Sequence, residues 1–403
     1  MNHDTPLPDA GKLQPYTGGR TLMLGGAVLG LIGLGLTALL GMANPGQALL
    51  AYLVAYVYWL GIAVGALALV MANHIAGARW NVTVRRIGET LAGAIPLFVV
   101  LFIPLALGAK HVWWWVSPNQ LSKAAEEAMQ GKQGWFALGN WLLRTAFYFL
   151  VWTVLSTLLR RWSLQQDESG DPELTVKQRK LSAPGLLLLA FTITFAAFDW
   201  IMSLQPGWYS TIFGLYVFIG GFVASLSLVC LIVTGIRSGG GPLAELITVD
   251  HQHNLGKLLL AFTAFWAYMG FSQYMLIWAG NLPEELTWIV VRSRGPWGPI
   301  GTLLIIGHFV LPFFLLLSRP LKRNPASLAA VSAWMLVIHY VDVYWVVMPA
   351  ANADRLGLSL THLTAFAGVG GLSVAAGVFL LRGARAVPVK DPFLADSLRY
   401  VQP

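Results

Sequence analysis

Apolar residues recur along this chain in long runs rather than in the short alternating patterns of soluble strands and helices. Ten runs come close to or exceed the roughly 20 residues that a helix needs to cross a bilayer. They are Leu22–Met42, Ala48–Ala72, Thr90–Gly108, Trp135–Leu159, Pro184–Leu204, Thr211–Ile236, Gly256–Gly280, Ile300–Ser318, Ser327–Met348 and Thr361–Leu381. The pattern predicts an all-α integral membrane protein with ten transmembrane helices.

The predicted organisation is one membrane domain, residues 22–382, between an N-terminal segment, 1–21, and a C-terminal tail, 383–403. Composition agrees, since 56% of the 403 residues are hydrophobic and 11% are charged, against about a quarter charged in soluble domains. The single cysteine, Cys230, excludes a disulfide framework and a Cys-ligated iron–sulfur cluster or zinc site. Without a C-x-x-C-H motif there is no covalent c-type haem.

The distribution of basic residues predicts the orientation. With the N-terminus inside, the inner segments hold 19 Lys and Arg and the outer segments hold six. Cytoplasmic segments of membrane proteins carry the excess of these residues. We therefore expect both termini in the cytoplasm, and we assign the net charge of +8 to topology rather than to nucleic-acid binding.

Weak internal repeats predict how the helices are grouped. Asp199-x6-Pro206 in the fifth span matches Asp342-x6-Pro349 in the ninth, and the Tyr58/Gly61 pair resembles the Tyr216/Gly220 pair. Copies four spans apart have the same orientation, so they would be related by an axis along the membrane normal. The expected architecture is two parallel-related four-helix bundles, spans 2–5 and 6–9, plus two peripheral helices.

Ionisable groups inside spans are costly and are functional candidates. Those of this chain are Arg144, Asp199, His308, His339 and Asp342, while Glu89 and Lys257 lie at the inner ends of spans. The first five are expected in one band, on the order of 8–14 Å below the outer ends of their helices. His339 and Asp342 share a helical face, and a carboxylate beside an imidazole can relay protons.

Each candidate has a simpler interpretation. Arg144 and Asp199 can be a structural ion pair, and His339 can hydrogen-bond a carbonyl. His308 and His339 can be the two ligands of a b-type haem, although one His pair is a poor signal for it. The spacing Asp250-His251-Gln252-His253 resembles a metal motif, but we interpret it as a solvated loop.

Small residues and tryptophans are also unevenly placed. Gly26-x3-Gly30 and Gly61-x3-Gly65 predict close helix packing.

Twelve of the 17 tryptophans are expected near the outer side. They form either an uneven interfacial belt or a face that docks a partner or an aromatic-lined ligand pocket.

Two stretches resemble a known family. The segment 250–257, DHQHNLGK, with 265–268 and 271–285 after it, and the segment 198–206, FDWIMSLQP, with 208–216 after it, resemble the ActF subunits of bacterial alternative complex III. The wider family is that of NrfD and the polysulfide reductase membrane subunits. The detailed likeness covers spans five to seven, and the ten-span layout covers the whole chain. The run His251-Gln252-His253-Asn254 is less rich in His and Asp than the family pattern, which puts a metal or proton role for it in doubt.

The resemblance implies a subunit of a quinol:electron-acceptor oxidoreductase in the bacterial inner (plasma) membrane. Its partners would be an ActC-type membrane subunit, an iron–sulfur subunit, multihaem and monohaem cytochrome c subunits and a terminal oxidase. Electrons would pass to cytochrome c or to the oxidase. The ActF-type subunit would hold no redox metal, and its cofactor, if any, would be menaquinone or its quinol.

The sequence hypothesis is therefore a respiratory membrane subunit that conducts protons or forms a quinol pocket, and is not catalytic alone. The candidate residues for that role are Asp199, Asp342, His339, His308, Arg144, Glu89 and Lys257, the last two at an inner mouth. The alternatives are a stand-alone NrfD-type quinone-oxidising subunit, a parallel-repeat secondary transporter and a structural scaffold. Which quinone binds and which acceptor is used are left open by the sequence.

Overall fold

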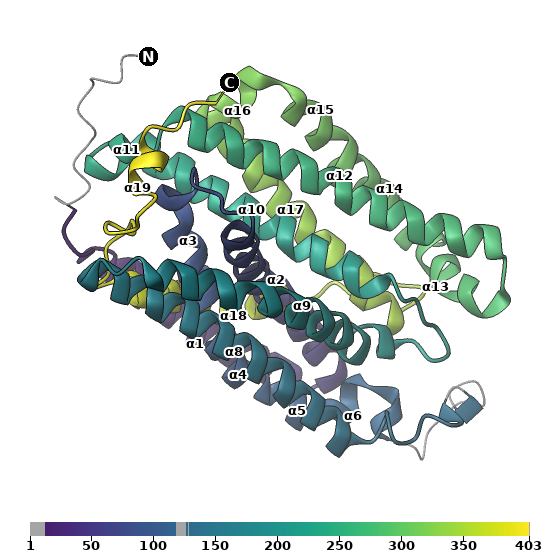
Figure 1. The fold of residues 1–403 in the computed structure, drawn as a ribbon. Helices are drawn as coiled ribbons and strands as arrows, with labels where there is room; N and C mark the ends of the chain where they lie inside the picture. The colour runs from purple at the N-terminus through teal and green to yellow at the C-terminus, as the bar shows by residue number, and fades with distance from the viewer. Residues whose placement is uncertain (1–12, 118–125, 128, 403) are drawn as a thin grey trace.

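The computed structural model describes residues 13–117, 126, 127 and 129–402. Residues 1–12 of the predicted N-terminal segment lie outside this range, as do Lys12 and Lys123 of the charge count. Among the described residues, ten helical segments are long and apolar enough to cross a membrane, which confirms the all-helical, ten-span prediction. The helices run alongside one another, and the start of the described chain, in purple, lies at the same end of the bundle as the C-terminal residues, in yellow (Figure 1). We call this the terminal end and the other the distal end.

Eight spans are continuous α-helices or end in one short 3-10 turn. Six of them are the continuous helices α1 (Arg20–Gly41), α2 (Pro45–Ile75), α8 (Leu138–Ser169), α10 (Phe213–Gly239), α12 (Val249–Gly280) and α18 (Leu360–Leu381). The fifth span, α9 (Glu173–Trp200), ends in the 3-10 turn η4 (Met202–Leu204), and the ninth, α17 (Pro325–Val347), ends in η6 (Met348–Ala350). The third and eighth spans are each divided into three pieces. They comprise α3 (Val82–Gly93), α4 (Ile95–Leu101) and α5 (Ile103–Leu107), and α14 (Trp297–Leu304), η5 (Ile305–Val310) and α15 (Leu311–Leu317).

Short helices connect the spans at both ends of the bundle. They are α6 (Ala109–Val112), η2 (Trp114–Val116), α11 (Pro242–Leu246), α13 (Pro283–Ser293) and α16 (Arg319–Arg323). A further short helix, α19 (Leu394–Leu398), lies in the C-terminal tail. Several helices are longer than the spans predicted from hydropathy. α8 and α9 continue well past their apolar runs and meet at Gly170, whose φ of 70° ends α8. A helix does not stop where its residues become polar, so hydropathy locates the membrane crossing rather than the whole helix.

The most buried spans are α2 and α10, which pack directly on each other. Gly61 and Gly65 of α2 face Gly221 of α10, and a Cβ added at Gly65 would lie 2.8 Å from the Gly221 carbonyl oxygen. The peripheral helices α1 and α18 pair in the same way, since a Cβ at Gly33 would lie 2.6 Å from the backbone nitrogen of Gly368. The predicted close packing at the small-residue motifs is confirmed.

Candidate functional site

The Asp342 carboxylate, on α17, is buried among side chains of other helices. The Tyr216 hydroxyl, from α10, donates a hydrogen bond to Asp342 Oδ1 at 2.5 Å. The Trp266 indole, from α12, donates to Oδ2 at 3.1 Å. His339 lies one turn before Asp342, with its Nδ1 3.7 Å from Oδ2. One carboxylate thus joins three spans, and an imidazole stands beside it.

His308 completes this cluster from the eighth span. It lies in η5, a π-helical segment, and its ring stacks on Trp266 with centroids 3.9 Å apart. Pro312 follows four residues later and has no N–H to donate to the His308 carbonyl, which weakens the α-helical pattern at this turn. Such π turns occur frequently at functional sites. The local sequence therefore widens the helix where an imidazole faces the carboxylate.

The two imidazoles are buried and incompletely bonded. His308 is fully buried and His339 is 3% exposed. Within the described part of the chain, neither ring nitrogen of His308 has a hydrogen-bond partner, and Nδ1 of His339 has none either. Most buried polar atoms are hydrogen-bonded, so three unpartnered nitrogens in one place call for an explanation. A proton, a water molecule or a ligand can supply the missing partner.

The cluster also has the donor set of a metal site. His308, His339 and Asp342 each offer a ligand atom, and these atoms lie within 4.8 Å of one another. Two imidazoles and a carboxylate suit zinc or ferrous iron. However, both Asp342 oxygens already accept hydrogen bonds, from Tyr216 and Trp266. The carboxylate is thus satisfied without a metal, and the unpartnered atoms are all on the imidazoles.

Asp199, on α9, has different neighbours. Arg144 of α8 donates two hydrogen bonds to its carboxylate, from Nε at 2.9 Å and from Nη2 at 2.8 Å. The Tyr148 hydroxyl donates to Asp199 Oδ2 at 2.8 Å. The Arg144 guanidinium lies 4.0 Å above the ring of Trp135. This geometry is that of a bidentate ion pair between two helices, the structural alternative that the sequence left open.

The residues predicted to share one band therefore form two separate clusters, one around Asp199 and one around Asp342. Glu89 belongs to a third cluster at the terminal end, and Lys257 is exposed on α12. Glu89 accepts a hydrogen bond from Arg85 Nε at 2.9 Å, and its other oxygen lies 3.5 Å from Arg86 Nε. Glu89 is 2% exposed and paired with two arginines, so its carboxylate is held inside this cluster.

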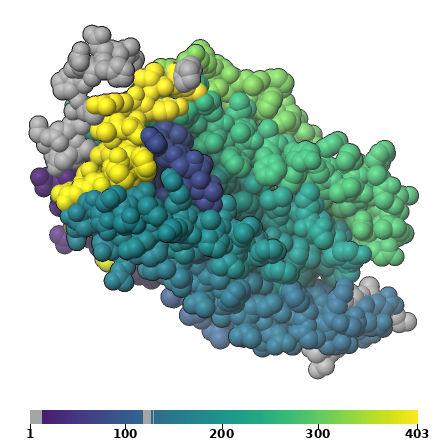
Figure 2. Space-filling model, in the orientation of Figure 1, coloured from purple at the N-terminus to yellow at the C-terminus, as the bar shows by residue number. Residues whose placement is uncertain are grey.

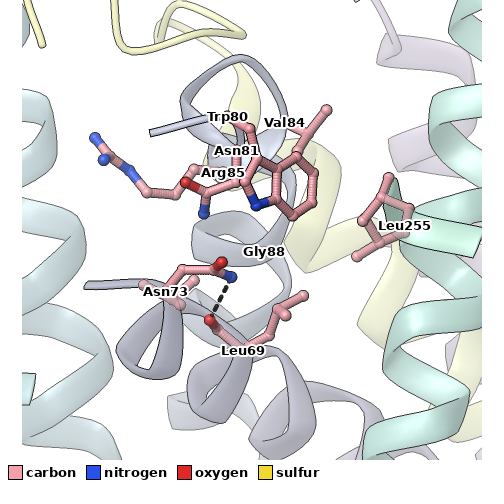
Figure 3. A pocket seen from close by; sticks show the side chains of 10 residues that line it. Leu69, Asn73, Trp80, Asn81, Val84, Arg85, Gly88 and Leu255 are labelled. Carbon is pink, nitrogen blue, oxygen red and sulfur yellow. Dashed lines mark hydrogen bonds between the residues drawn. The ribbon is translucent and has the colours of Figure 1, made fainter. Parts of the chain in front are cut away.

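The terminal-end cluster extends into the C-terminal tail. Arg85 also pairs with Asp391 of the tail at 2.7 Å, and Arg86 pairs with Asp167 of α8 at 2.6 Å. A cavity of about 20 Å³ lies beside Arg85, lined by residues such as Asn73 and Gly88 (Figure 3). That volume has room for about one water molecule. These buried charges tie the tail to the membrane domain.

The tail is accordingly part of the fold rather than a separate segment. Val387 and Leu394 pack with Val82 and Leu246 in a small apolar cluster. The C-terminal residues, yellow in Figure 2, lie across this end of the molecule beside α3, in dark blue. The hydrophobic pattern could not predict this docking, because the tail is short and mixed in polarity.

The interpretation of 250–253 as a solvated loop is wrong. These residues form the first turn of α12, where Thr248 and His251 make reciprocal capping bonds. His251 and Gln252 are fully buried and His253 is 5% exposed. The His251 ring contacts the Ser397 carbonyl through Nε2 at 3.1 Å. The polar residues bind the tail and the neighbouring helices, which explains why they are buried despite their polarity.

Most of the distal tryptophans are structural. Several are buried, and their indole N–H groups bind backbone carbonyls at helix ends or in loops, as when Trp113 donates to the Trp200 carbonyl and Trp297 to the Asn352 carbonyl. Trp208 and Trp288 stack with centroids 4.9 Å apart. Buried rings cannot form a face that docks a partner. Among those that the sequence placed there, Trp135 and Trp278 are exposed.

Sequence reasoning missed several residues that build these clusters. Tyr216, Tyr148 and Trp266 were not predicted to be partners of the two aspartates. No local pattern reveals contacts between residues more than 50 positions apart. Arg292 of α13 was counted only as an outer charge. It is 2% exposed and donates to the carbonyls of Trp345 and Val346. Burial lowers the pKa of its guanidinium to about 9, so it is still cationic at neutral pH.

Comparison with known proteins adds no relative. No protein-family model matches the chain, and no curated protein matches it. The clusters described above and the motif resemblance are therefore the features that bear on function.

Proposed function

We propose that this chain is a membrane subunit of a bacterial respiratory quinol:electron-acceptor oxidoreductase, in which the His308–His339–Asp342 cluster takes up and releases protons. Electrons pass through iron–sulfur and cytochrome c subunits, and this chain contributes no redox metal. It lies in the inner membrane with both termini in the cytoplasm. The supports for this orientation are the excess of basic residues on the terminal side and the common end at which the described chain starts and finishes.

One observation carries the proposal: among the described residues, three nitrogens of two buried imidazoles have no hydrogen-bond partner, and each imidazole has a ring nitrogen within 4.8 Å of one buried carboxylate inside the membrane-spanning bundle. Histidine is the side chain that most readily changes charge near neutral pH. When an imidazole takes up a proton, Asp342 stabilises the resulting cation at short range, 3.7 Å from His339. When the proton leaves, the Tyr216 and Trp266 donors keep the carboxylate hydrogen-bonded. Both charge states are thus supported.

Proton handling fits the cluster better than a quinol pocket does. The three side chains are at most 3% exposed. The three cavities characterised among the described residues are lined by other side chains, including the apolar cavity of about 340 Å³ between α2, α3 and α18. A quinol headgroup would need open space beside its proton acceptor. A proton needs only a chain of hydrogen-bonding groups.

The same proposal includes the paired-bundle arrangement, spans 2–5 and 6–9, with α1 and α18 outside. It is supported by the similar surroundings of Asp199 and Asp342, since each carboxylate accepts a hydrogen bond from a tyrosine of another span. The Gly61 and Gly221 contact joins the second and sixth spans, which are the first helix of each bundle.

Gentle solubilisation of the tagged chain from its native membrane tests the assignment to a complex. We expect mass spectrometry to find an iron–sulfur subunit, haem subunits and a second ten-span subunit, together with a c-type haem spectrum. Recovery of the chain alone, without haem, contradicts the respiratory assignment. Solute uptake by vesicles that contain only this chain would then favour the transporter alternative.

A further inference from the structure

A basic cleft at the terminal end is separate from the clusters described above. It has a volume of about 510 Å³ and lies between α1, α8 and α18. Each of these helices contributes or adjoins one arginine: Arg20 begins α1, Arg160 lies in α8 and Arg382 directly follows α18. The rest of the lining includes Met23, Leu164 and Phe379. The cleft thus combines three positive charges with an apolar wall.

Within the part of the chain that the structure describes, the arginines of this cleft, Arg20, Arg160 and Arg382, have no carboxylate counter-ion. The nearby acids are already committed, because Glu89, Asp167 and Asp391 pair with Arg85 and Arg86.

Two guanidinium nitrogens of the cleft are also buried without a partner. Arg160 is 8% exposed and donates one hydrogen bond to the Leu380 carbonyl, but its Nη1 has no partner within the described residues. Nη1 of Arg382 has none there either. A buried charge without a partner is costly, so an anion is the expected occupant.

The position of the cleft along the membrane normal and its apolar wall indicate which kind of anion it binds. α1 and α18 have 22 residues each, which at 1.5 Å per residue is about 33 Å, close to the thickness of the hydrocarbon core. The ends of both helices therefore lie where lipid phosphates lie. Phe379 is 68% exposed beside the arginines, in position to contact an acyl chain.

We propose that this cleft binds the phosphate of an anionic phospholipid, with an acyl chain against Met23 and Phe379. The guanidinium groups of Arg160 and Arg382 donate to the phosphate oxygens, and Arg20 closes the cleft from α1. Basic pockets between transmembrane helices recognise anionic headgroups in this way. This site does not depend on the proposed respiratory function.

The test uses the purified full chain, delipidated in mild detergent, and follows its thermal unfolding as lipid is added. We expect phosphatidylglycerol to raise the unfolding temperature and phosphatidylcholine to leave it unchanged. In the Arg160→Gln and Arg382→Gln variants, the concentration of phosphatidylglycerol needed for half the shift should rise about tenfold. Arg161→Gln is the matched control, because Arg161 is the exposed neighbour of Arg160 on α8, and it should keep the wild-type response.

Three results would overturn the proposal. An equal shift with phosphatidylcholine would show that the headgroup charge does not matter. An equal shift with inorganic phosphate alone would show that the cleft takes a free anion rather than a lipid. A wild-type response in Arg382→Gln would show that these arginines do not bind the headgroup. Arg382 is half-buried, so its replacement should disturb folding less than the replacement of the buried Arg160.

Discussion

Asp199 and Asp342 are two versions of one arrangement. Each is a buried aspartate followed seven residues later by a proline, and each accepts a hydrogen bond from a tyrosine of another span. They differ in the basic group beside them. Asp199 has a bidentate arginine, Arg144, whereas Asp342 has the imidazoles of His308 and His339.

The basic group determines whether the charge of each site is fixed or variable. Arginine stays protonated at any physiological pH, so the Arg144–Asp199 pair is a fixed contact that holds α8 against α9. Histidine gains and loses its proton near neutrality, so the Asp342 cluster can change its charge. Under the proposed function, the first site is structural and the second is chemical. Variants of each site separate the two roles.

Arg144→Met breaks the structural site. It leaves the Asp199 carboxylate, whose side chain is 1% exposed, without its counter-ion, at a cost of about 3–5 kcal/mol in the free energy of unfolding. Denaturant unfolding in detergent measures it. Arg323→Met is the control, because Arg323 pairs with Asp250 near the surface and its loss should cost less than about 1 kcal/mol. Equal losses in the free energy of unfolding for the two variants would show that the Arg144–Asp199 pair contributes no more to stability than a surface ion pair.

Gly220→Ala disturbs the chemical site by crowding. A Cβ there would lie 2.8 Å from His339 Cε1, and we expect a loss of about 1–3 kcal/mol together with displacement of the imidazole. Gly235→Ala, on the same helix α10, meets no atom within 4 Å and should be neutral or slightly stabilising. Thermal unfolding of both variants checks this, and a stable Gly220→Ala would mean that His339 is free to move.

His308→Phe should have the smallest effect on stability. Phenylalanine keeps the stacking on Trp266 and removes two nitrogens that have no partner. The change should be less than about 1 kcal/mol, of either sign. Proton movement per electron in the complex should nevertheless fall. A large destabilisation would indicate that a ligand or a structural water satisfies these nitrogens, and metal analysis of the purified chain would then identify any ion.

The sequence predicted the parts of the structure that depend on hydropathy and short spacing. The ten spans and the glycine contacts at Gly61 and Gly65 follow from composition that is local to each helix. It also placed His339 and Asp342 on one face, because residues three apart always share a helical face.

The rest depends on contacts between distant segments. Tyr216 reaches Asp342 across 126 residues, and Asp391 reaches Arg85 across 306. No single-sequence pattern encodes such pairs. The burial of His251 was missed for the same reason, because its environment is built by the tail around Ser397. Polarity alone predicts exposure, and here a folded partner segment replaces water.

The most direct test of the account is the number of protons moved per electron by the purified complex in liposomes. Asp342→Asn keeps an acceptor for Tyr216 but removes the charge beside the imidazoles, so we expect coupled proton movement to fall while assembly is kept. Asp199→Asn, the matched variant of the structural site, should assemble less stably but keep the wild-type ratio. An unchanged ratio in Asp342→Asn, or an equal fall in both variants, would contradict the assignment of proton handling to the Asp342 cluster.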